Sequence, residues 1–213
     1  MSSQAPDDGQ LTIALEETMK PWTGDLDVMI EKRTIRILTV FSKTFYFIDK
    51  GVQRGAVYDM GRLFVDDLNR KLARDNKLKN KNLKLHAVFI PVGRGDILQA
   101  LVAGKGDIAM SNLTLTEERR KLVDFSSPIY SDVSELVVSG PASPAVSSVD
   151  DLAGKQVFVR RSSSYYESLV ALNRRFATQK KPAVIIKEAP ETLEDEDLIE
   201  MVNAGLIPFS VVD

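Results

Sequence analysis

The sequence predicts an α/β protein built from two successive series of strands and helices. Short runs of apolar and β-branched residues, such as IRILTV at residues 35–40 and QVFVR at residues 156–160, have the length and composition of buried strands. Stretches with helical spacing of apolar residues separate these runs, and such alternation favours parallel sheets with right-handed crossovers. The stretch SGPASPAVSS, residues 139–148, marks a boundary between the two series.

The first series is expected to follow an N-terminal extension, residues 1–32, which is partly disordered and contains short helices at residues 11–19 and 25–32. A loop, residues 41–55, then joins the first strand to a long helix and carries Tyr46 near its middle. The elements of this series are expected at residues 35–40 (strand), 58–74 (helix), 84–91 (strand), 96–103 (helix), 107–110 (strand), a short helix that carries Arg119, and 134–138 (strand).

The second series is expected at residues 156–160 (strand), 164–176 (helix), 183–188 (strand), 192–204 (helix) and 209–212 (strand). Gly104 and Gly205 are placed to end helices. The acidic run at residues 194–197 falls in the first turns of the last helix, where negative charge complements the helix dipole. We expect this run to cap the helix rather than to form a metal site.

The composition is that of a soluble globular protein, because 44% of the 213 residues are hydrophobic and 27% are charged. A net charge of −2 with mixed signs argues against a nucleic-acid-binding surface, and no apolar run approaches the roughly 18 residues that a membrane span needs. The chain has no cysteine and one histidine, His86, which falls inside a predicted strand. We therefore expect no disulfide, no metal site and no cofactor.

The most informative stretch is GDIAMSNLTLTEERRKLVDFSSPIY, residues 106–130. It predicts a buried strand that ends in a polar loop, residues 111–116, with Arg119 about one helical turn further on. Hydroxyls and backbone N–H groups at a helix N-terminus favour an anion, and the planar guanidinium of Arg119 is suited to clamp a carboxylate. The alternative is a strand, a turn and a helix with an exposed arginine.

Three serines open the first helix of the second series and form another polar cluster. Ser164 and Glu167 have the spacing of a capping box, so Ser164 is expected to cap the helix. Ser162 and Ser163 are then freer to face a ligand, with Arg161 within reach.

Asp213 follows the last predicted strand, and the carboxyl ends of strands are where open α/β sheets bind ligands. The alternative for Asp213 is a helix N-cap.

Other motifs give no evidence of a functional site. Arg94-Gly95-Asp96 is expected to be a turn into a helix, and a single histidine inside a strand argues against a Ser-His-Asp triad. Carboxylate pairs for glycoside cleavage stay open, because Asp and Glu are numerous.

The string from the polar loop onwards resembles the type II periplasmic solute-binding proteins of the polar amino-acid class, solute-binding family 3. Their first lobe ends in a Ser/Thr-rich loop, then T-x-x-R and D-F-S-x-P-Y; the matching residues here are Ser111, Asn112, Thr114, Arg119, Asp124, Phe125, Ser126, Pro128 and Tyr130. Asn112 stands where Ser or Gly is usual, and Tyr130 comes one residue late. The resemblance implies that this loop and Arg119 hold the α-carboxylate of an amino acid.

The same resemblance implies ligand contacts from elsewhere in the chain. Ser163 and Ser164 would contact the ligand from the second lobe, and Asp213 would bind its ammonium group. Tyr46 is the remaining expected ligand contact, in the loop after the first strand.

The implied fold is the type II periplasmic-binding-protein fold, with two α/β lobes and a cleft between them. The expected division is residues 33–140 for the first lobe, 141–148 for a hinge, and 149–213 for an incomplete second lobe. In the family the chain returns from the second lobe to the first, and this return is expected to be missing here.

Several strings together resemble the N-terminal module of the F-type membrane-bound lytic murein transglycosylases: GDLDVMIEKRTIRILTV, RGAVYDM, DDLAGKQVFVRRSSSYYESL and LEDEDLIEMVNAGLIPFSVVD. In those enzymes a regulatory solute-binding module precedes a catalytic domain. The resemblance implies a non-catalytic regulatory module of the periplasm or cell envelope, which binds an amino acid or a muropeptide-like ligand and has a downstream catalytic domain as partner. The start, MSSQAPDDGQ, lacks the apolar segment of a signal peptide, which is expected to have been removed.

Two other functions stay open from the sequence. One is a free-standing receptor that delivers amino acids to an ABC transporter, and the other is an enzyme in its own right. A downstream catalytic domain would separate the regulatory module from the receptor, and turnover of peptidoglycan by this chain alone would support the enzyme.

Overall fold

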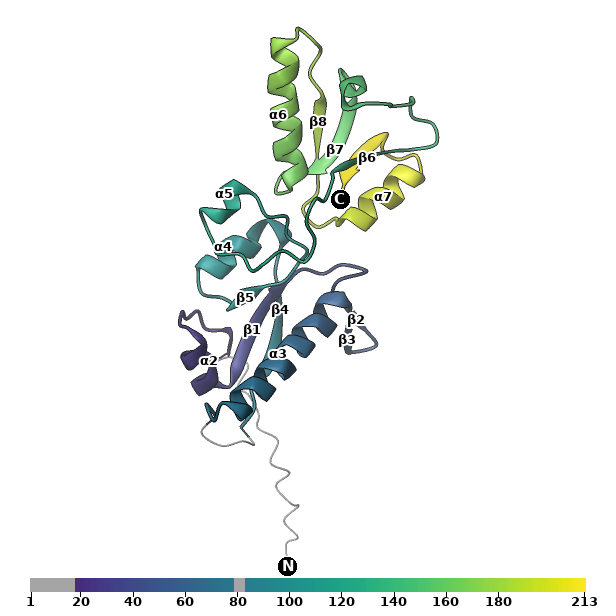
Figure 1. The fold of residues 1–213 in the computed structure, drawn as a ribbon. Helices are drawn as coiled ribbons and strands as arrows, with labels where there is room; N and C mark the ends of the chain where they lie inside the picture. Colours follow the sequence, from purple (N-terminus) through teal and green to yellow (C-terminus); the bar gives the residue numbers. More distant parts are fainter. Residues whose placement is uncertain (1–17, 79–82) are drawn as a thin grey trace, which may run out of the picture.

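The computed structural model describes residues 18–78 and 83–213 and contains two main sheets, one at each end of an elongated molecule (Figure 1). The first sheet has the strand order β4-β1-β5, and the second has the order β6-β9-β7-β8. The strands are β1 (Thr34–Thr39), β2 (Phe47–Asp49), β3 (Val52–Arg54), β4 (His86–Pro91), β5 (Ile108–Ala109), β6 (Leu136–Ser139), β7 (Gln156–Arg160), β8 (Ile185–Ala189) and β9 (Phe209–Val212). The helices are α2 (Leu26–Lys32), α3 (Ala56–Arg74), α4 (Ile97–Val102), α5 (Glu117–Arg120), α6 (Ser164–Thr178) and α7 (Asp195–Asn203), with 3₁₀ turns η1 (Arg94–Asp96) and η2 (Val149–Leu152).

The first sheet is parallel and is built around β1, whose six residues are all buried. Because successive side chains of a strand point to opposite faces, β1 packs against helices on both sides. Ile35 and Ile37 pack with Val65 of α3, whereas Leu38 packs with Ile97 of α4. A strand that is covered on both faces needs a nearly continuous apolar sequence, which is what the run IRILTV supplies.

Arg36 is the charged exception in β1, and its side chain is fully buried. Its guanidinium pairs with Asp107, at 2.7 Å between Nη2 and Oδ1. It also donates to the carbonyls of Lys20, Trp22 and Gly104, and its carbon lies 4.0 Å from the centre of a Trp22 ring. These partners compensate the buried charge, so Arg36 ties the segment before α2 and the loop after α4 to the first sheet.

The second sheet is covered by α6 on one face and by α7 on the other. Val157 and Val159 of β7 pack with Leu169 of α6, whereas Phe158 packs with Leu198 of α7. β7 pairs in parallel with β8 and β9, as expected for strands that alternate with helices.

β6 belongs to the second sheet, because it pairs antiparallel with β9 from Leu136–Val212 to Ser139–Phe209. The sequence placed this strand at the end of the first lobe, residues 33–140. A strand's partner is set by pairing over a long separation in the chain, and local composition does not reveal it. The stretch at residues 139–148 therefore follows a strand of the second sheet instead of dividing the two sheets.

The other predicted helices and strands within the described residues are confirmed, with ends shifted by up to three residues. The loop at residues 41–55 differs, because it contains the hairpin β2–β3. Lys50 and Gly51 form its turn with φ values of 50° and 82°, which is the positive pair that a type I′ turn requires. The predictions for residues 1–10, and for most of the helix at residues 11–19, lie outside the described residues.

Candidate functional site

The candidate site lies at the junction of the two sheets, where residues that follow the strands meet. Arg94 follows β4, Ser111 follows β5, Ser162 follows β7 and Asp213 follows β9. The C-terminus marks this junction in Figure 1. Since open α/β sheets bind ligands outside the carboxyl ends of their strands, the two sheets here present their binding edges to each other.

Arg119 joins the loops of the two sheets. Thr116 caps α5 by accepting a hydrogen bond from the Arg119 backbone N–H, which fixes where the arginine leaves the helix. The guanidinium donates through Nη1 to the Thr114 carbonyl at 2.7 Å and through Nη2 to the Ser162 carbonyl at 3.0 Å. Burial lowers the pKa of Arg119 from its ordinary value, but a guanidinium remains charged. It has five N–H donors, so three have no partner among the described residues after these two bonds.

Ser111 places an unpaired hydroxyl in the same loop. The residue is 3% exposed, and its Oγ has no hydrogen-bond partner among the described residues. Buried hydroxyls are nearly always paired, so a polar atom of a ligand would satisfy this one. The exposed Asn112 follows with a φ of 44°, a left-handed conformation that Asn tolerates better than most residues. It turns the chain at the end of β5.

The helix α6 begins at Ser164, as expected, but its N-cap is one residue earlier than the capping-box pattern indicated. Ser163 is the N-cap, since its Oγ accepts from the Tyr166 N–H and donates to the Arg160 carbonyl at 2.7 Å. The prediction that Ser164 caps the helix is therefore wrong, because Ser164 is already the first helical residue. Its hydroxyl instead lies 3.5 Å from the Thr114 Oγ1, across the junction. Ser164 thus faces the first sheet, while the Ser163 hydroxyl is used within its own helix.

The two residues before this cap are held by carboxylates of the second sheet. Ser162 donates through its backbone N–H and its hydroxyl to Glu191, at 3.0 and 2.5 Å. Arg161 pairs with Glu188 at 2.7 Å and lies over the ring of Tyr166. The Arg161 side chain therefore lies along the second sheet, whereas the sequence suggested that it would reach toward a ligand beside Ser162 and Ser163.

Asp213 completes a series of polar groups that starts at Arg119. The Thr114 hydroxyl donates to the Asp213 carboxylate at 3.3 Å. Nearby, the Tyr165 hydroxyl lies 3.2 Å from Asp195. Burial raises the pKa of Tyr165, and the charges of Asp195 and Asp213 raise it further, so the phenol stays protonated and remains a donor. The junction therefore holds a cation, a hydroxyl and an anion in succession.

Tyr46 contacts none of these residues in the described part of the chain and directly precedes the hairpin strand β2. It is buried, its hydroxyl donates to Gln53 of β3 at 2.9 Å, and its ring stacks on Phe89 of β4 with 5.8 Å between centroids. Burial raises its pKa. Within residues 18–78 and 83–213, its hydrogen bond and ring contacts all involve residues of the first sheet and hairpin region, so the structure does not bring it to Arg119.

Sequence reasoning missed the pair of Arg94 and Glu194, whose side chains are 11% and 6% exposed. Arg94 does belong to the predicted turn, but its guanidinium crosses the junction. Its Nε lies 2.7 and 2.9 Å from the Glu194 carboxylate oxygens, and its Nη1 donates to the Ser111 carbonyl at 3.1 Å. The signal that could have found it is position, because Arg94 follows the carboxyl end of a parallel strand.

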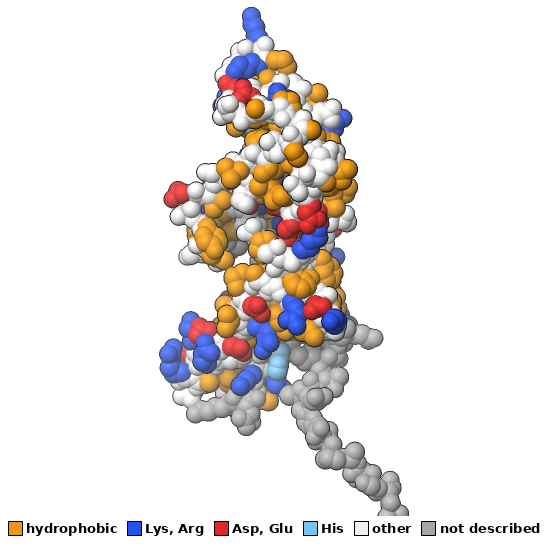
Figure 2. Space-filling model, turned by 90° about the vertical axis from the view of Figure 1, so that its right-hand side faces the viewer, with side chains coloured by type: hydrophobic (Ala, Val, Ile, Leu, Met, Phe, Trp, Pro, Cys, Tyr) orange, Lys and Arg blue, Asp and Glu red, His pale blue; other side chains and the backbone are white. Residues whose placement is uncertain are grey.

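A second set of contacts joins the loop after β1 to α7. Ser42 donates to Glu196 at 2.6 Å, and the Lys43 ammonium lies 2.9 Å from Asp197 and 2.8 Å from Glu200. The hydrogen bonds that the Lys43 ammonium donates to Glu200 and, next in size, to Asp197 raise the pKa of Lys43. The predicted capping by the acidic run is confirmed, since its members form a capping box, but they also contact the first sheet's loops. Figure 2 shows acidic and basic side chains gathered about half-way along the molecule.

Comparison with known proteins places the chain among binding proteins. The family model described as bacterial extracellular solute-binding proteins, family 3, matches residues 42–207. Membrane-bound lytic murein transglycosylase F of Pseudomonas fluorescens (strain Pf0-1) is 28% identical over 190 residues, which are 88% of this chain and 35% of that protein. The protein of the same name from Saccharophagus degradans is 32% identical over 120 residues, 56% of this chain and 22% of that protein. The chain thus spans about a third, or less, of the length of these curated relatives.

Solved structures of amino-acid-binding proteins are similar over most of the chain. An ancestral arginine-binding protein bound to arginine has a TM-score of 0.57 and 25% identity, over 84% of this chain and 70% of that one. An ancestral amino-acid-binding protein, described as a precursor of cyclohexadienyl dehydratase, has a TM-score of 0.58 and 27% identity, over 88% and 73%. Among the helices that the structure describes, none is long and apolar enough to cross a membrane.

Proposed function

Because the chain belongs to family 3 of the bacterial extracellular solute-binding proteins, we propose that it binds a small zwitterion, an amino acid or a peptidoglycan-derived peptide, between its two sheets. The predicted family and the type II periplasmic-binding-protein fold are confirmed by the family match and by the similar amino-acid-binding structures. The ligand, the residues that hold it and its effect are the proposal.

The observation that carries the proposal is the succession of Arg119, Thr114 and Asp213. The hydrogen bonds join a cation to an anion through one threonine, with Arg119 bonded to its carbonyl and Asp213 to its hydroxyl. An amino acid has a carboxylate and an ammonium on one carbon, so it needs an opposite charge on each side. Arg119 keeps three donors for the carboxylate, Asp213 accepts from the ammonium, and the Ser111 hydroxyl is available for a further bond.

The proposed role is regulation of a peptidoglycan lytic transglycosylase in the periplasm or cell envelope. The support is similarity to membrane-bound lytic murein transglycosylases over 88% of this chain, although the match covers only 35% of the relative. In this proposal catalysis belongs to a separate domain, and ligand binding by this module changes how that domain works. Peptidoglycan turnover by the chain alone would contradict the assignment of a purely binding role.

The test is a thermal-shift panel of amino acids and muropeptides, followed by calorimetry on the best ligand. A ligand at about a hundred times its Kd stabilises the folded state by roughly 2.7 kcal/mol, which is readily measured. A muropeptide that outperforms free amino acids supports the regulatory role, whereas an amino acid alone supports a transport receptor.

Arg119→Lys is the variant that tests the site itself. An ammonium does not reproduce the planar fork, so binding should weaken by roughly 2–5 kcal/mol if the ion pair is desolvated. Arg120→Lys is the matched control, because Arg120 is the exposed neighbour on the same helix. Equal affinity of the two variants would show that Arg119 does not hold the ligand.

A further inference from the structure

The outer edge of the first sheet is open in the described part of the chain. β4 is the last strand of the order β4-β1-β5 and pairs only with β1 there. The backbone N–H groups of His86 and Val92 donate to the Arg33 and Thr39 carbonyls, at or beside β1. Because backbone groups alternate in direction along a strand, those of the odd-numbered residues point outward. Pro91 is one of these, and its missing N–H is typical of an edge position.

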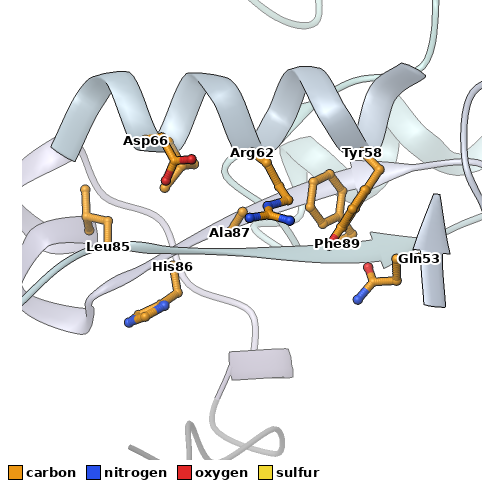
Figure 3. A pocket seen from close by; sticks show the side chains of 9 residues that line it. Gln53, Tyr58, Arg62, Asp66, Leu85, His86, Ala87 and Phe89 are labelled. Carbon is orange, nitrogen blue, oxygen red and sulfur yellow. The ribbon is translucent and has the colours of Figure 1, made fainter. Parts of the chain in front are cut away.

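A pocket of about 230 Å³ lies beside this edge, between β4 and α3. Figure 3 shows Leu85, Ala87 and Phe89 of β4 and the segment before it on the side of the strand that faces α3. These three side chains form an apolar floor, while His86 points to the opposite side of the strand. The outward backbone groups of Ala87 and Phe89 run along the same edge, so an added strand would gain both hydrogen bonds and apolar contacts.

The helix α3 lines this pocket with the buried Val65 and with three residues that form its wall: Tyr58, Arg62 and Asp66 (Figure 3). They are spaced by four residues, which is about 6 Å along a helix. Alternate side chains of an extended peptide are about 6.6 Å apart, so each would meet one residue of the wall. The spacing of the side chains along the pocket wall therefore matches the spacing of alternate side chains in an extended strand.

The charges of the wall are available to a partner. Arg62 and Asp66 are exposed, and neither forms an ion pair with a described residue. The Arg62 guanidinium lies 5.7 Å from the centre of the Tyr58 ring, which itself packs against Phe89. The wall thus presents an aromatic ring, a cation and an anion in order. An apolar, an acidic and a basic side chain would complement it in the same order.

We propose that the groove between α3 and β4 binds an extended segment of another protein as an added edge strand, with apolar, acidic and basic side chains at alternate positions facing α3. The backbone of that segment bonds to the open edge of β4, and its acidic side chain meets Arg62. This surface is separate from the junction at Arg119, so binding there does not require the small-molecule ligand.

The test uses end-blocked, fluorescein-labelled heptapeptides with the sequences TVTETKT and TKTETVT, which cover both strand directions. Fluorescence anisotropy should show binding of at least one of them, and at least tenfold weaker binding of TVTKTET and TETKTVT, in which the charges are exchanged. Arg62→Glu should weaken the preferred peptide at least tenfold and favour its charge-exchanged form. Arg70→Glu on the same helix is the control and should change neither, because Arg70 does not line the pocket.

A second measurement addresses the backbone. Amide hydrogen exchange of Ala87 and Phe89 should slow when the preferred peptide is bound. Of two versions of this peptide, one methylated at its odd-numbered and the other at its even-numbered backbone nitrogens, one should no longer bind. Equal binding of both charge orders, displacement by free glutamate at the same concentration as by unlabelled peptide, or unchanged exchange at Ala87 and Phe89 would overturn the proposal. Absence of binding by either peptide at millimolar concentration would overturn it as well.

Discussion

Arg94, in the turn after β4, and Glu194, at the N-cap of α7, form a largely buried ion pair that joins the two halves of the molecule. Removing one partner of a buried pair leaves an uncompensated charge and costs about 3–5 kcal/mol. The cost should fall on the arrangement in which the two halves are in contact, because their separation would hydrate the remaining carboxylate. We therefore expect Arg94→Met to increase the radius of gyration measured by X-ray scattering. Arg120→Met removes an exposed cation and should leave the radius unchanged; equal radii of the two variants would contradict this role.

The location of individual residues at the junction could be predicted where it depends only on their position after a strand. The place of Ser111, Thr114 and Asp213 at the junction could be predicted, because polar residues after buried strands lie at the binding edge of a sheet; their contacts with a ligand remain a proposal. The partner of Arg119 in the second half of the molecule could not be predicted, because the Ser162 carbonyl lies 43 residues further along the chain. Neighbouring serines raise a different problem, since Ser163 and Ser164 both suit an N-cap. Only the position at which the helix begins separates them.

At the scale of elements, Gly61 sets how closely α3 approaches the first sheet. A Cβ at this position would lie 2.8 Å from the Phe89 ring and 2.9 Å from the Ile37 Cδ1. Overpacking of this kind costs about 1–3 kcal/mol, which should exceed the gain in helix propensity of about 1 kcal/mol. We expect Gly61→Ala to lower the free energy of unfolding in urea.

Leu63→Ala supplies the comparison, because Leu63 is on the same helix and is 66% exposed. It should change the free energy of unfolding by no more than about 0.5 kcal/mol, the range of surface substitutions. If Gly61→Ala is as stable as the wild type, α3 does not depend on this close approach.

The elements themselves were largely predictable from periodicity, because β1 and α3 have long, clear patterns. The hairpin β2–β3 was missed for a local reason: its strands are three residues each, and Lys50 takes a turn position where Asn or Asp is usual. The sheet to which β6 belongs was missed for a non-local reason, since its partner β9 lies about seventy residues away.

At the scale of the whole molecule, acid should weaken the junction through Glu196. Burial raises the pKa of this carboxyl, but hydrogen bonds from the Ser42 hydroxyl and from backbone N–H groups outweigh it, so the pKa lies below its ordinary value. A lowered folded-state pKa stabilises the protein above the unfolded-state pKa, and this contribution is lost as the pH falls through the folded-state pKa. Glu196→Gln should therefore melt at a lower temperature than the wild type at pH 7.

The difference between the two proteins should shrink as the pH falls through the lowered pKa of the wild-type carboxyl, because that carboxyl then becomes protonated. Melting curves at closely spaced pH values measure this difference directly. Glu188→Gln is a control on the second sheet, because Glu188 pairs with the exposed Arg161 and not with the first sheet. A constant difference between wild type and Glu196→Gln from pH 7 to pH 3 would exclude the proposed contribution.

The distribution of charge across the junction has a consequence for the ionic strength of the medium. Cations of the first sheet's loops, Lys43 and Arg94, face carboxylates of α7 and of its N-cap. Dissolved salt shortens the Debye length from about 10 Å at 0.1 M to about 3 Å at 1 M, which screens exposed pairs far more than buried ones. Lys43 is 55% exposed and its partner Glu200 66% exposed, whereas Arg94 is 11% exposed. Concentrated salt should therefore weaken the contact at Lys43 first, while the ion pair at Arg94 continues to hold the two halves together.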